Sequence, residues 1–177
     1  MAANIVLTGF MGTGKSTIAR LLAAALGREF IDTDVLIIAR HGEIADIFLQ
    51  QGEATFREIE KELATELASR DGLVVASGGG MLLDPEVADI IGGEARVFCL
   101  TAESDTILAR VVGDKSGTVR PLLAGPDPAG RVTDLLAQRA IRYRAFEQVP
   151  TDDRTPDDVV ADIIARLSFH EQAEPEG

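Results

Sequence analysis

One glycine-rich run near the N-terminus limits what this chain can fold into more than any other feature. Residues 9–16 read GFMGTGKS and satisfy the pattern G-x-x-x-x-G-K-[ST]. The run follows the β-branched segment NIVLT (4–8) and precedes STIARLLAAAL (16–26), in which apolar residues recur at helical spacing. A strand that passes through such a loop into a helix directs backbone N–H groups and the positive end of the helix at a phosphate group. The sequence therefore predicts a nucleoside triphosphate site on an α/β scaffold.

The loop also predicts roles for its side chains. Lys15 can reach the β- and γ-phosphates, which makes it a candidate catalytic residue, and the Ser16 hydroxyl can bind Mg²⁺. A chance match to the pattern is the alternative, but the flanking strand and helix and the intact lysine and serine argue against it. We expect the following residues to bind ATP: Gly12, Thr13, Gly14, Lys15, Ser16 and Thr17.

Strand and helix patterns alternate along the rest of the chain. Short apolar runs predict strands at 30–31, 73–76 and 96–100, and a last one near Val149, where Pro150 is unusual for a strand. Helical patterns occupy 35–40, 44–51, 53–70, 85–91, 103–112, 132–146 and the residues after Thr155. Strands that alternate with helices form a parallel sheet covered on both faces. We expect a three-layer α/β fold whose central parallel sheet has about five strands.

The length suits a single domain, which we place at residues 1–167, followed by an acidic, disordered tail at 168–177. Between 113 and 130 the sequence GDKSGTVRPLLAGPDPAG has too many glycines and prolines for a long regular element. It is either a mobile lid or an ordinary surface connection. Arg120, which precedes the stiff Pro121, suits a lid that brings a cation onto a phosphoryl group during transfer.

Two aspartates at the end of the second predicted strand are candidates for metal and acceptor chemistry. Asp32 and Asp34 lie two residues apart, so on a strand their side chains point the same way, at the edge where ligands bind in open α/β sheets. One can hold a metal ion through water while the other orients or deprotonates the attacking hydroxyl. The alternative is that they cap the helix that starts at Val35.

Two further stretches contain residues that a binding site could use. Arg57 and Glu60 have the i, i+3 spacing of one helix face, for which a surface ion pair is the favoured interpretation. Gly78–Gly80 directly follow a predicted strand, and three successive glycines allow the backbone to approach a ligand closely. A plain turn would rarely need all three.

The charge balance restricts the partners. The chain has 29 acidic and 17 basic residues and a net charge of −12, so nucleic acid is not an expected partner and local cations must bind any anionic substrate. No apolar run approaches the ~18 residues that span a bilayer, and the N-terminus lacks a signal sequence, so we expect a cytoplasmic protein with no membrane partner. The single cysteine, Cys99, lies in the apolar run VFCL and is interpreted as a buried hydrophobic residue.

Together these motifs resemble the shikimate kinase family, small P-loop kinases of aromatic amino-acid biosynthesis. The resemblance covers about residues 4–167 and rests on GFMGTGKST, FIDTDVLI, ADIFLQQGEATFREIE, SGGG, RPLLAG, Arg139 with Tyr143 four residues later, and Arg154-Thr-Pro. It implies a P-loop kinase fold with an acceptor-binding region near 33–61 and a lid near 113–130. It also implies a monomer that uses Mg²⁺ and transfers the γ-phosphoryl group of ATP to the 3-hydroxyl of shikimate.

The resemblance further implies roles for individual residues. Asp34 would hold the acceptor's hydroxyls and act as the base, while Arg57 and Arg139 would bind its carboxylate. The remaining implied roles are acceptor binding by Gly78, Gly79 and Gly80, Mg²⁺ binding by Ser16 and Asp32, catalysis and ATP binding by Arg120 in the lid, and nucleotide binding by Arg110 and Arg154.

Two other functions remain open at this point. A P-loop kinase for another hydroxylated carboxylate, such as gluconate, could use the same aspartate and arginines. A catalytically silent nucleotide-binding protein could share the fold, but the loss of Lys15, Asp34 or Arg120 would be its sign, and all three are present.

Overall fold

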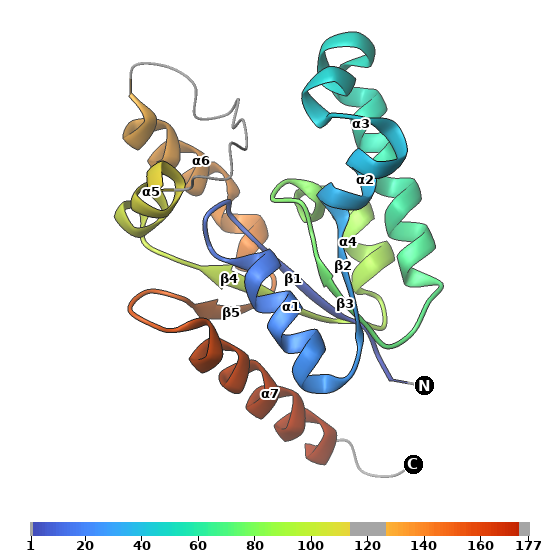
Figure 1. The fold of residues 1–177 in the computed structure, drawn as a ribbon, viewed down its shortest axis with the longest axis vertical. Helices are drawn as coiled ribbons and strands as arrows, with labels where there is room; N and C mark the ends of the chain where they lie inside the picture. Colours follow the sequence, from blue (N-terminus) through green and yellow to red (C-terminus); the bar gives the residue numbers. More distant parts are fainter. Residues whose placement is uncertain (1, 114–126, 174–177) are drawn as a thin grey trace.

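A parallel sheet of five strands forms the centre of the molecule (Figure 1). The computed structural model describes residues 2–113 and 127–173. The strands are β1 (Ile5–Gly9), β2 (Glu29–Asp32), β3 (Leu73–Ala76), β4 (Arg96–Thr101) and β5 (Glu147–Pro150). They lie in the order β2-β3-β1-β4-β5, and each neighbouring pair is parallel. The predicted parallel sheet is therefore confirmed.

Helices cover both faces of the sheet. One face packs against α1 (Lys15–Leu26) and α7 (Pro156–Ala173), and Figure 1 shows α1 crossing in front of the strands. The other face packs against α2 (Thr33–His41), α3 (Ile44–Ala68), the 3-10 turn Met81–Leu83 and α4 (Pro85–Gly92) at one end, and α5 (Ser104–Gly113) and α6 (Pro128–Tyr143) at the other.

The side chains of the strands alternate between these two layers. Ile5 and Leu7 of β1 pack in the cluster with α1 and α7, whereas Val6 packs in the cluster with α3 and α4. Neighbouring strands follow the same period of two, as parallel strands buried on both faces do. Cys99 is fully buried as predicted, and burial raises the pKa of its thiol to about 11.

The helix predictions hold with shifts at the ends. The two helices predicted at 44–51 and 53–70 form α3, which is interrupted at Gly52, where φ is 87° and ψ is 167°. Helix α6 begins at Pro128, four residues before the predicted start, because Pro128 occupies its first turn and the Asp127 carboxylate caps the Gly130 N–H.

Both flanks of the predicted lid therefore belong to helices. Gly113 ends α5 and Pro128–Gly130 begin α6, while residues 114–126, with Arg120, lie outside the described residues.

Helix α7 continues to Ala173, past Ser168, where we expected the disordered tail to begin. The sequence after Ser168 is polar, but a helix already held against α1 can continue through polar residues on its solvent side.

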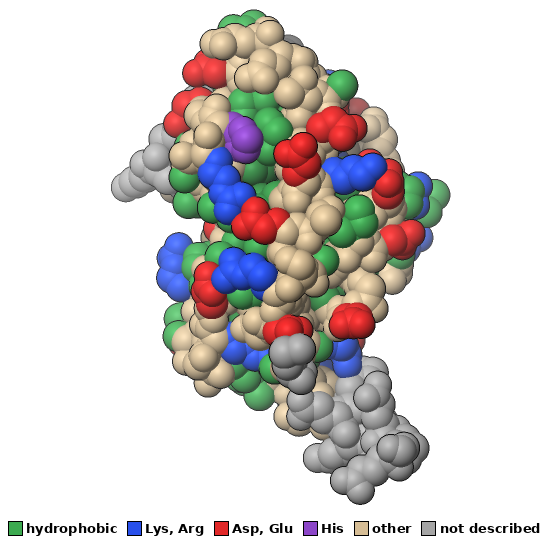
Figure 2. Space-filling view, turned by 90° about the vertical axis from the view of Figure 1, so that its right-hand side faces the viewer, with side chains coloured by type: hydrophobic (Ala, Val, Ile, Leu, Met, Phe, Trp, Pro, Cys, Tyr) green, Lys and Arg blue, Asp and Glu red, His purple; other side chains and the backbone are tan. Residues whose placement is uncertain are grey.

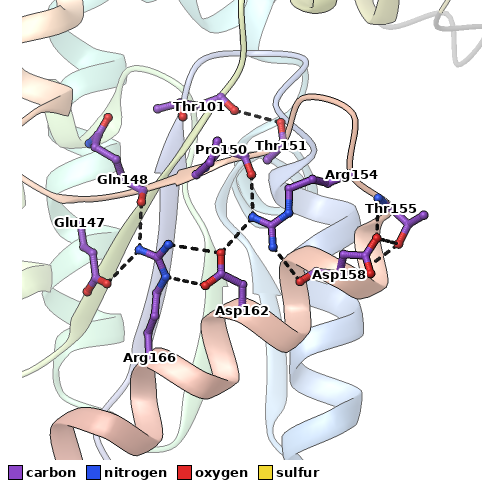
Figure 3. Close-up of polar contacts among 10 residues, drawn as sticks. All are labelled: Thr101, Glu147, Gln148, Pro150, Thr151, Arg154, Thr155, Asp158, Asp162 and Arg166. Atoms are coloured by element: carbon purple, nitrogen blue, oxygen red, sulfur yellow. Dashed lines mark hydrogen bonds and ion pairs between the residues drawn. The ribbon is translucent and has the colours of Figure 1, made fainter.

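The last strand forms despite its proline because it lies at the edge of the sheet. β5 pairs only with β4, so Pro150 need not donate a hydrogen bond to a second neighbour. Polar contacts from α7 hold the strand in place (Figure 3): Arg166 pairs with Glu147 at 3.1 Å and donates to the Gln148 carbonyl at 3.0 Å.

Charged side chains of both signs are mixed on the face that includes α2, α3 and α4 (Figure 2). Ion pairs join the helices there, among them Arg40–Glu66 between α2 and α3 and Lys61–Glu86 between α3 and α4. Within residues 2–113 and 127–173, no helix is both long and apolar enough to cross a membrane.

The strand order determines where a ligand can bind. β1 lies between β3 and β4 in the sheet. β2 and β3 lie on one side of β1, and β4 and β5 lie on the other, so the order of the strands reverses direction at the carboxyl end of β1. In open α/β sheets, such a reversal leaves a crevice outside the carboxyl ends of the strands. The glycine loop after β1 and the glycine run after β3 both lie at this edge.

We predict that Gly9→Ala destabilises the fold by about 2–5 kcal/mol. Gly9 has φ of 130°, and a Cβ there would lie 2.3 Å from the backbone oxygen of Leu100 in β4. Gly27→Ala is the matched control, because Gly27 has φ of 63° but no atom within 4 Å of an added Cβ, so only the backbone strain of about 1–2 kcal/mol applies. Denaturant unfolding measures both; equal losses would contradict a steric conflict at Gly9.

Candidate active site

The phosphate-binding loop between β1 and α1 presents backbone donors. Gly9, Gly12 and Gly14 all have positive φ, a conformation that glycine adopts without strain. Gly14 is the N-cap of α1 and supplies no side-chain cap, so the N–H groups of the first turn are left for a ligand. Lys15 Nζ donates to the carbonyls of Gly9 at 2.9 Å and Phe10 at 3.0 Å, so the lysine lies over the loop.

Ser16 and Asp32 meet as predicted. Ser16 Oγ donates to Asp32 Oδ2 at 2.6 Å, between the start of α1 and the end of β2. A hydroxyl and a carboxylate are the oxygen ligands that Mg²⁺ prefers, and it usually binds few protein groups together with phosphate oxygens and water. Among the described residues, no group of three or more His, Cys, Asp or Glu side chains could hold a metal alone. This pair therefore fits a divalent cation that arrives with a nucleotide.

The two aspartates have different positions from those predicted. Asp32 ends β2, and its Oδ1 accepts hydrogen bonds from the N–H groups of Asp34 at 3.1 Å and Val35 at 3.3 Å. Asp32 thus caps α2, as the alternative interpretation held, and Asp34 lies in the first turn of that helix rather than on the strand. Burial raises the pKa of Asp34, the negative charge of Asp32 raises it further, and Lys15 opposes both effects.

The glycine run after β3 lies against the acceptor-side residues. A Cβ at Gly78 would lie 2.5 Å from Asp34 Oδ1, and one at Gly80 would lie 3.1 Å from Arg57 Nη1. A Cβ at Gly79 would approach the Gly9 carbonyl at 3.6 Å and Lys15 Nζ at 4.0 Å. The missing side chains therefore allow the phosphate loop, Asp34 and Arg57 to converge on one place. The close approach of this backbone to a ligand, which the three glycines suggested, stays a prediction.

Arg57 and Glu60 are more than a surface ion pair. Arg57 Nη1 binds Glu60 Oε2 at 2.6 Å, but the Glu60 side chain is only 3% exposed, whereas that of Arg57 is 36% exposed. Burial raises the pKa of Glu60 to about 7 against the opposing charge of Arg57, and the nearby Asp34 adds to the rise. Glu60 thus holds Arg57 from inside the protein, and Glu53 binds Arg57 Nη2 from outside at 3.0 Å. The i, i+3 spacing in the sequence did not indicate this burial.

Helix α6 supplies two more side chains to the site. Arg139 Nη1 lies 3.4 Å from the Gly79 carbonyl, and its guanidinium lies 5.4 Å from the centre of the Phe10 ring. The Tyr143 hydroxyl donates to the same carbonyl at 2.7 Å. Arg139 and Lys15 therefore both lie close to Gly79. Tyr143 was given no role from the sequence, and its only signal was the four-residue spacing from Arg139.

The two arginines expected at the nucleotide have separate surroundings. Arg110 lies beside the phosphate loop: its Nη1 contacts the Gly12 carbonyl at 3.3 Å and Thr151 Oγ1 at 2.9 Å. Arg154 is held at the start of α7 (Figure 3), where it binds Asp162 at 2.9 Å and the Pro150 and Asp158 carbonyls at 3.0 Å. These contacts do not bring Arg154 to the loop, so its role at the nucleotide stays a prediction, as does that of Arg120 outside the described residues.

Comparison with known proteins agrees with this geometry. The family model "Shikimate kinase" matches residues 11–168. The chain belongs to the shikimate kinase family. Shikimate kinase from Symbiobacterium thermophilum is 44% identical over 167 residues, which are 93% of this chain and 95% of that protein. Shikimate kinase from Mycobacterium tuberculosis is 43% identical over 178 residues and 98% of each chain.

Solved structures support the same assignment. The structure of shikimate kinase from Acinetobacter baumannii in complex with shikimate has a TM-score of 0.88 and 34% identity, and covers 96% of this chain and 95% of that one. A gluconokinase from Sinorhizobium meliloti 1021 covers 97% and 98% of the two chains with a TM-score of 0.63, but its 19% identity shows a shared fold only. This member of the shikimate kinase family is thus an ATP-dependent phosphotransferase with an alcohol acceptor, and its use of ATP implies a divalent metal.

We predict that Glu60 makes the stability of the protein fall between pH 4.5 and pH 7. The unfolded carboxyl loses its proton near its ordinary value of 4.5 and the folded one near 7, so the folded state binds more protons within this window. Its free energy of unfolding therefore decreases as the pH rises, by at most about 1.4 kcal/mol per pH unit, and levels off above pH 7.

Glu60→Gln is the variant that isolates this effect, because glutamine keeps the shape and does not titrate. Denaturant unfolding at pH 4.5, 6 and 7.5 should show a flatter profile for the variant than for the parent protein. Because Asp34 interacts with Glu60, the difference between the two profiles reports the removal of the Glu60 carboxyl together with its effect on Asp34. Parallel profiles would contradict a raised pKa at Glu60.

Proposed function

We propose that this chain transfers the γ-phosphoryl group of ATP to the 3-hydroxyl of shikimate, giving shikimate 3-phosphate and ADP. The observation that carries the proposal is the convergence at Gly78–Gly80: a half-buried carboxylate, Asp34, and a cation, Arg57, lie beside the lysine of the phosphate loop. An acceptor that carries hydroxyls and a carboxylate complements these groups. The family membership supports shikimate as this acceptor.

Arg57 and Arg139 are proposed to bind the carboxylate of the acceptor. Arg57 comes from α3 and Arg139 from α6, so the two guanidinium groups approach from either side of the glycine run. Charge-assisted hydrogen bonds of this kind are about twice as strong as neutral ones. In a chain of net charge −12, they supply the local positive charge that an anionic substrate needs.

Asp34 is proposed to orient the 3-hydroxyl and to accept its proton as the oxygen attacks. The pKa of Asp34 is raised by burial, which makes its carboxylate a stronger base than an ordinary aspartate. The substrate-binding residues that we propose are Asp34, Arg57, Gly78, Gly79, Gly80 and Arg139. The reaction then depends on positioning and charge neutralisation, with no covalent intermediate on the protein.

The nucleotide is proposed to bind along the phosphate loop. Gly12, Thr13, Gly14 and Thr17 provide backbone contacts, Lys15 contacts the β- and γ-phosphates, and Arg110 lies next to Gly12. Ser16 and, through water, Asp32 would hold Mg²⁺, which neutralises phosphate charge when it is bound. We further propose that the protein works in the cytoplasm as a monomer whose partners are ATP, ADP and shikimate.

A substrate panel tests the proposal. We expect ADP release with ATP, Mg²⁺ and shikimate, and none above background with gluconate or nucleoside monophosphates. Lys15→Ala is the control for the site and should lower kcat by about a hundredfold or more, because the transition state loses a charged contact, while circular dichroism stays unchanged. Turnover of gluconate at the rate of shikimate would overturn the choice of acceptor, and an active Lys15→Ala would overturn the role of the loop.

We predict that Arg57→Ala and Arg139→Ala weaken shikimate binding about tenfold to a hundredfold and leave ATP binding within about threefold. Each variant loses one charged contact to the carboxylate. Arg40→Ala is the matched control, because Arg40 pairs with Glu66 on the surface away from the glycine run. Calorimetric titration with each ligand measures the losses; equal losses for ATP and shikimate would indicate damage to the fold instead.

A further inference from the structure

The carbonyl of Gly79 is the meeting point of two donors from α6. The Tyr143 hydroxyl lies 2.7 Å from this oxygen, and Arg139 Nη1 lies 3.4 Å from it. The two residues are four positions apart, so both side chains lie on one face of the helix. The hydroxyl makes the short hydrogen bond, and the guanidinium only a long one.

The position of this carbonyl matters because the glycine run has no side chains to hold it. The backbone of the run is held by hydrogen bonds: Gly78 N–H donates to the side-chain Oγ1 of Thr33 at 2.8 Å, and Met81 N–H donates to the Gly78 carbonyl at 3.1 Å. Gly79 lies between these hydrogen bonds, against the phosphate loop on one side and α6 on the other. A displacement of Gly79 would therefore move the wall of the acceptor site and the surroundings of Lys15 together.

Tyr143 is itself held firmly. Its side chain is 6% exposed and packs in one cluster with Phe10, Cys99, Ile107 and Val132. The end of α6 is fastened to β5, because Gln148 Nε2 donates to the Tyr143 carbonyl at 2.6 Å. Burial raises the pKa of the Tyr143 phenol, so the hydroxyl keeps the proton that it donates at neutral pH.

We propose that Tyr143 is a positioning residue for the acceptor: its hydroxyl satisfies the Gly79 carbonyl, and this leaves Arg139 available for the acceptor's carboxylate. This inference rests on the proposed function of Arg139. The Gly79 carbonyl is half-buried, and in the absence of the hydroxyl the Arg139 guanidinium becomes its nearest donor from α6. The acceptor must then compete with Gly79 for the same cation.

The test is Tyr143→Phe, which removes only the hydroxyl. We expect the KM for shikimate to rise about threefold to tenfold, with the KM for ATP and kcat within about twofold of the parent protein. Thr8→Val is the matched control: among the described residues, Thr8 Oγ1 is buried and has no hydrogen-bond partner, so its removal should leave the KM for shikimate unchanged.

A double-mutant cycle with Arg139→Ala separates positioning from a general structural role. If Tyr143 acts through Arg139, Tyr143→Phe should change the KM for shikimate less than about twofold in the Arg139→Ala background, where no guanidinium remains to be drawn to Gly79. An undiminished effect in that background would overturn the inference. So would an unchanged KM for shikimate in Tyr143→Phe, or equal rises in the KM values of both substrates.

The parent protein in the same assay distinguishes this inference from the proposed function. If the parent protein phosphorylates shikimate and the cycle shows no coupling, only the role of Tyr143 is wrong. If the parent protein does not phosphorylate shikimate, both the proposed function and the role of Tyr143 toward that acceptor are wrong.

Discussion

The close approach of the phosphate loop to a run of three glycines governs the arrangement of the site. The phosphate loop starts from Gly9, packed against Leu100 of β4, and the glycine run is Gly78–Gly80 at the end of β3. Because β1 and β3 are neighbours in register, both stretches leave the sheet at the same edge. Any side chain between them would separate the lysine of the loop from the aspartate and arginine on the acceptor side. Their contact is thus what brings the lysine of the loop close to Asp34 and Arg57.

A second constraint is electrostatic. The chain is strongly acidic, and the proposed function requires two anionic substrates to bind side by side, so the cations at the site must supply local positive charge. Glu60 and Glu53 hold Arg57, and backbone carbonyls hold Lys15. Arg139 lies near the Phe10 ring and the Gly79 carbonyl. These neighbours orient the cations before a substrate arrives, which lowers the entropic cost of binding.

The two halves of the site are attached to different layers of the fold. Asp34 and Arg57 belong to α2 and α3 at one end of the sheet, whereas Arg139, Tyr143 and Arg110 belong to α5 and α6 at the other. The glycine run lies between the two groups and contacts both. Its hydrogen bonds to Thr33 on one side and Tyr143 on the other therefore connect the start of α2 to the end of α6.

The sequence by itself determined the features that depend on local geometry. A loop of fixed spacing after a strand, a proline in the first turn of a helix and a break at Gly52 follow from backbone conformations that few residues adopt, so the phosphate loop and most elements could be predicted.

The tertiary structure alone decided contacts between distant segments. The spacing of Arg57 and Glu60 is the same on a buried and an exposed helix face, and only the packing of α3 shows that Glu60 is inside. Likewise, Asp32 and Asp34 would share a face only if both lay on a strand, but β2 ends at Asp32, whose side chain caps the helix that contains Asp34. Tyr143 contacts a carbonyl 64 residues away because the order of the strands brings α6 to the end of β3. Such contacts depend on how layers pack, and a helical or strand pattern along the chain contains no information about them.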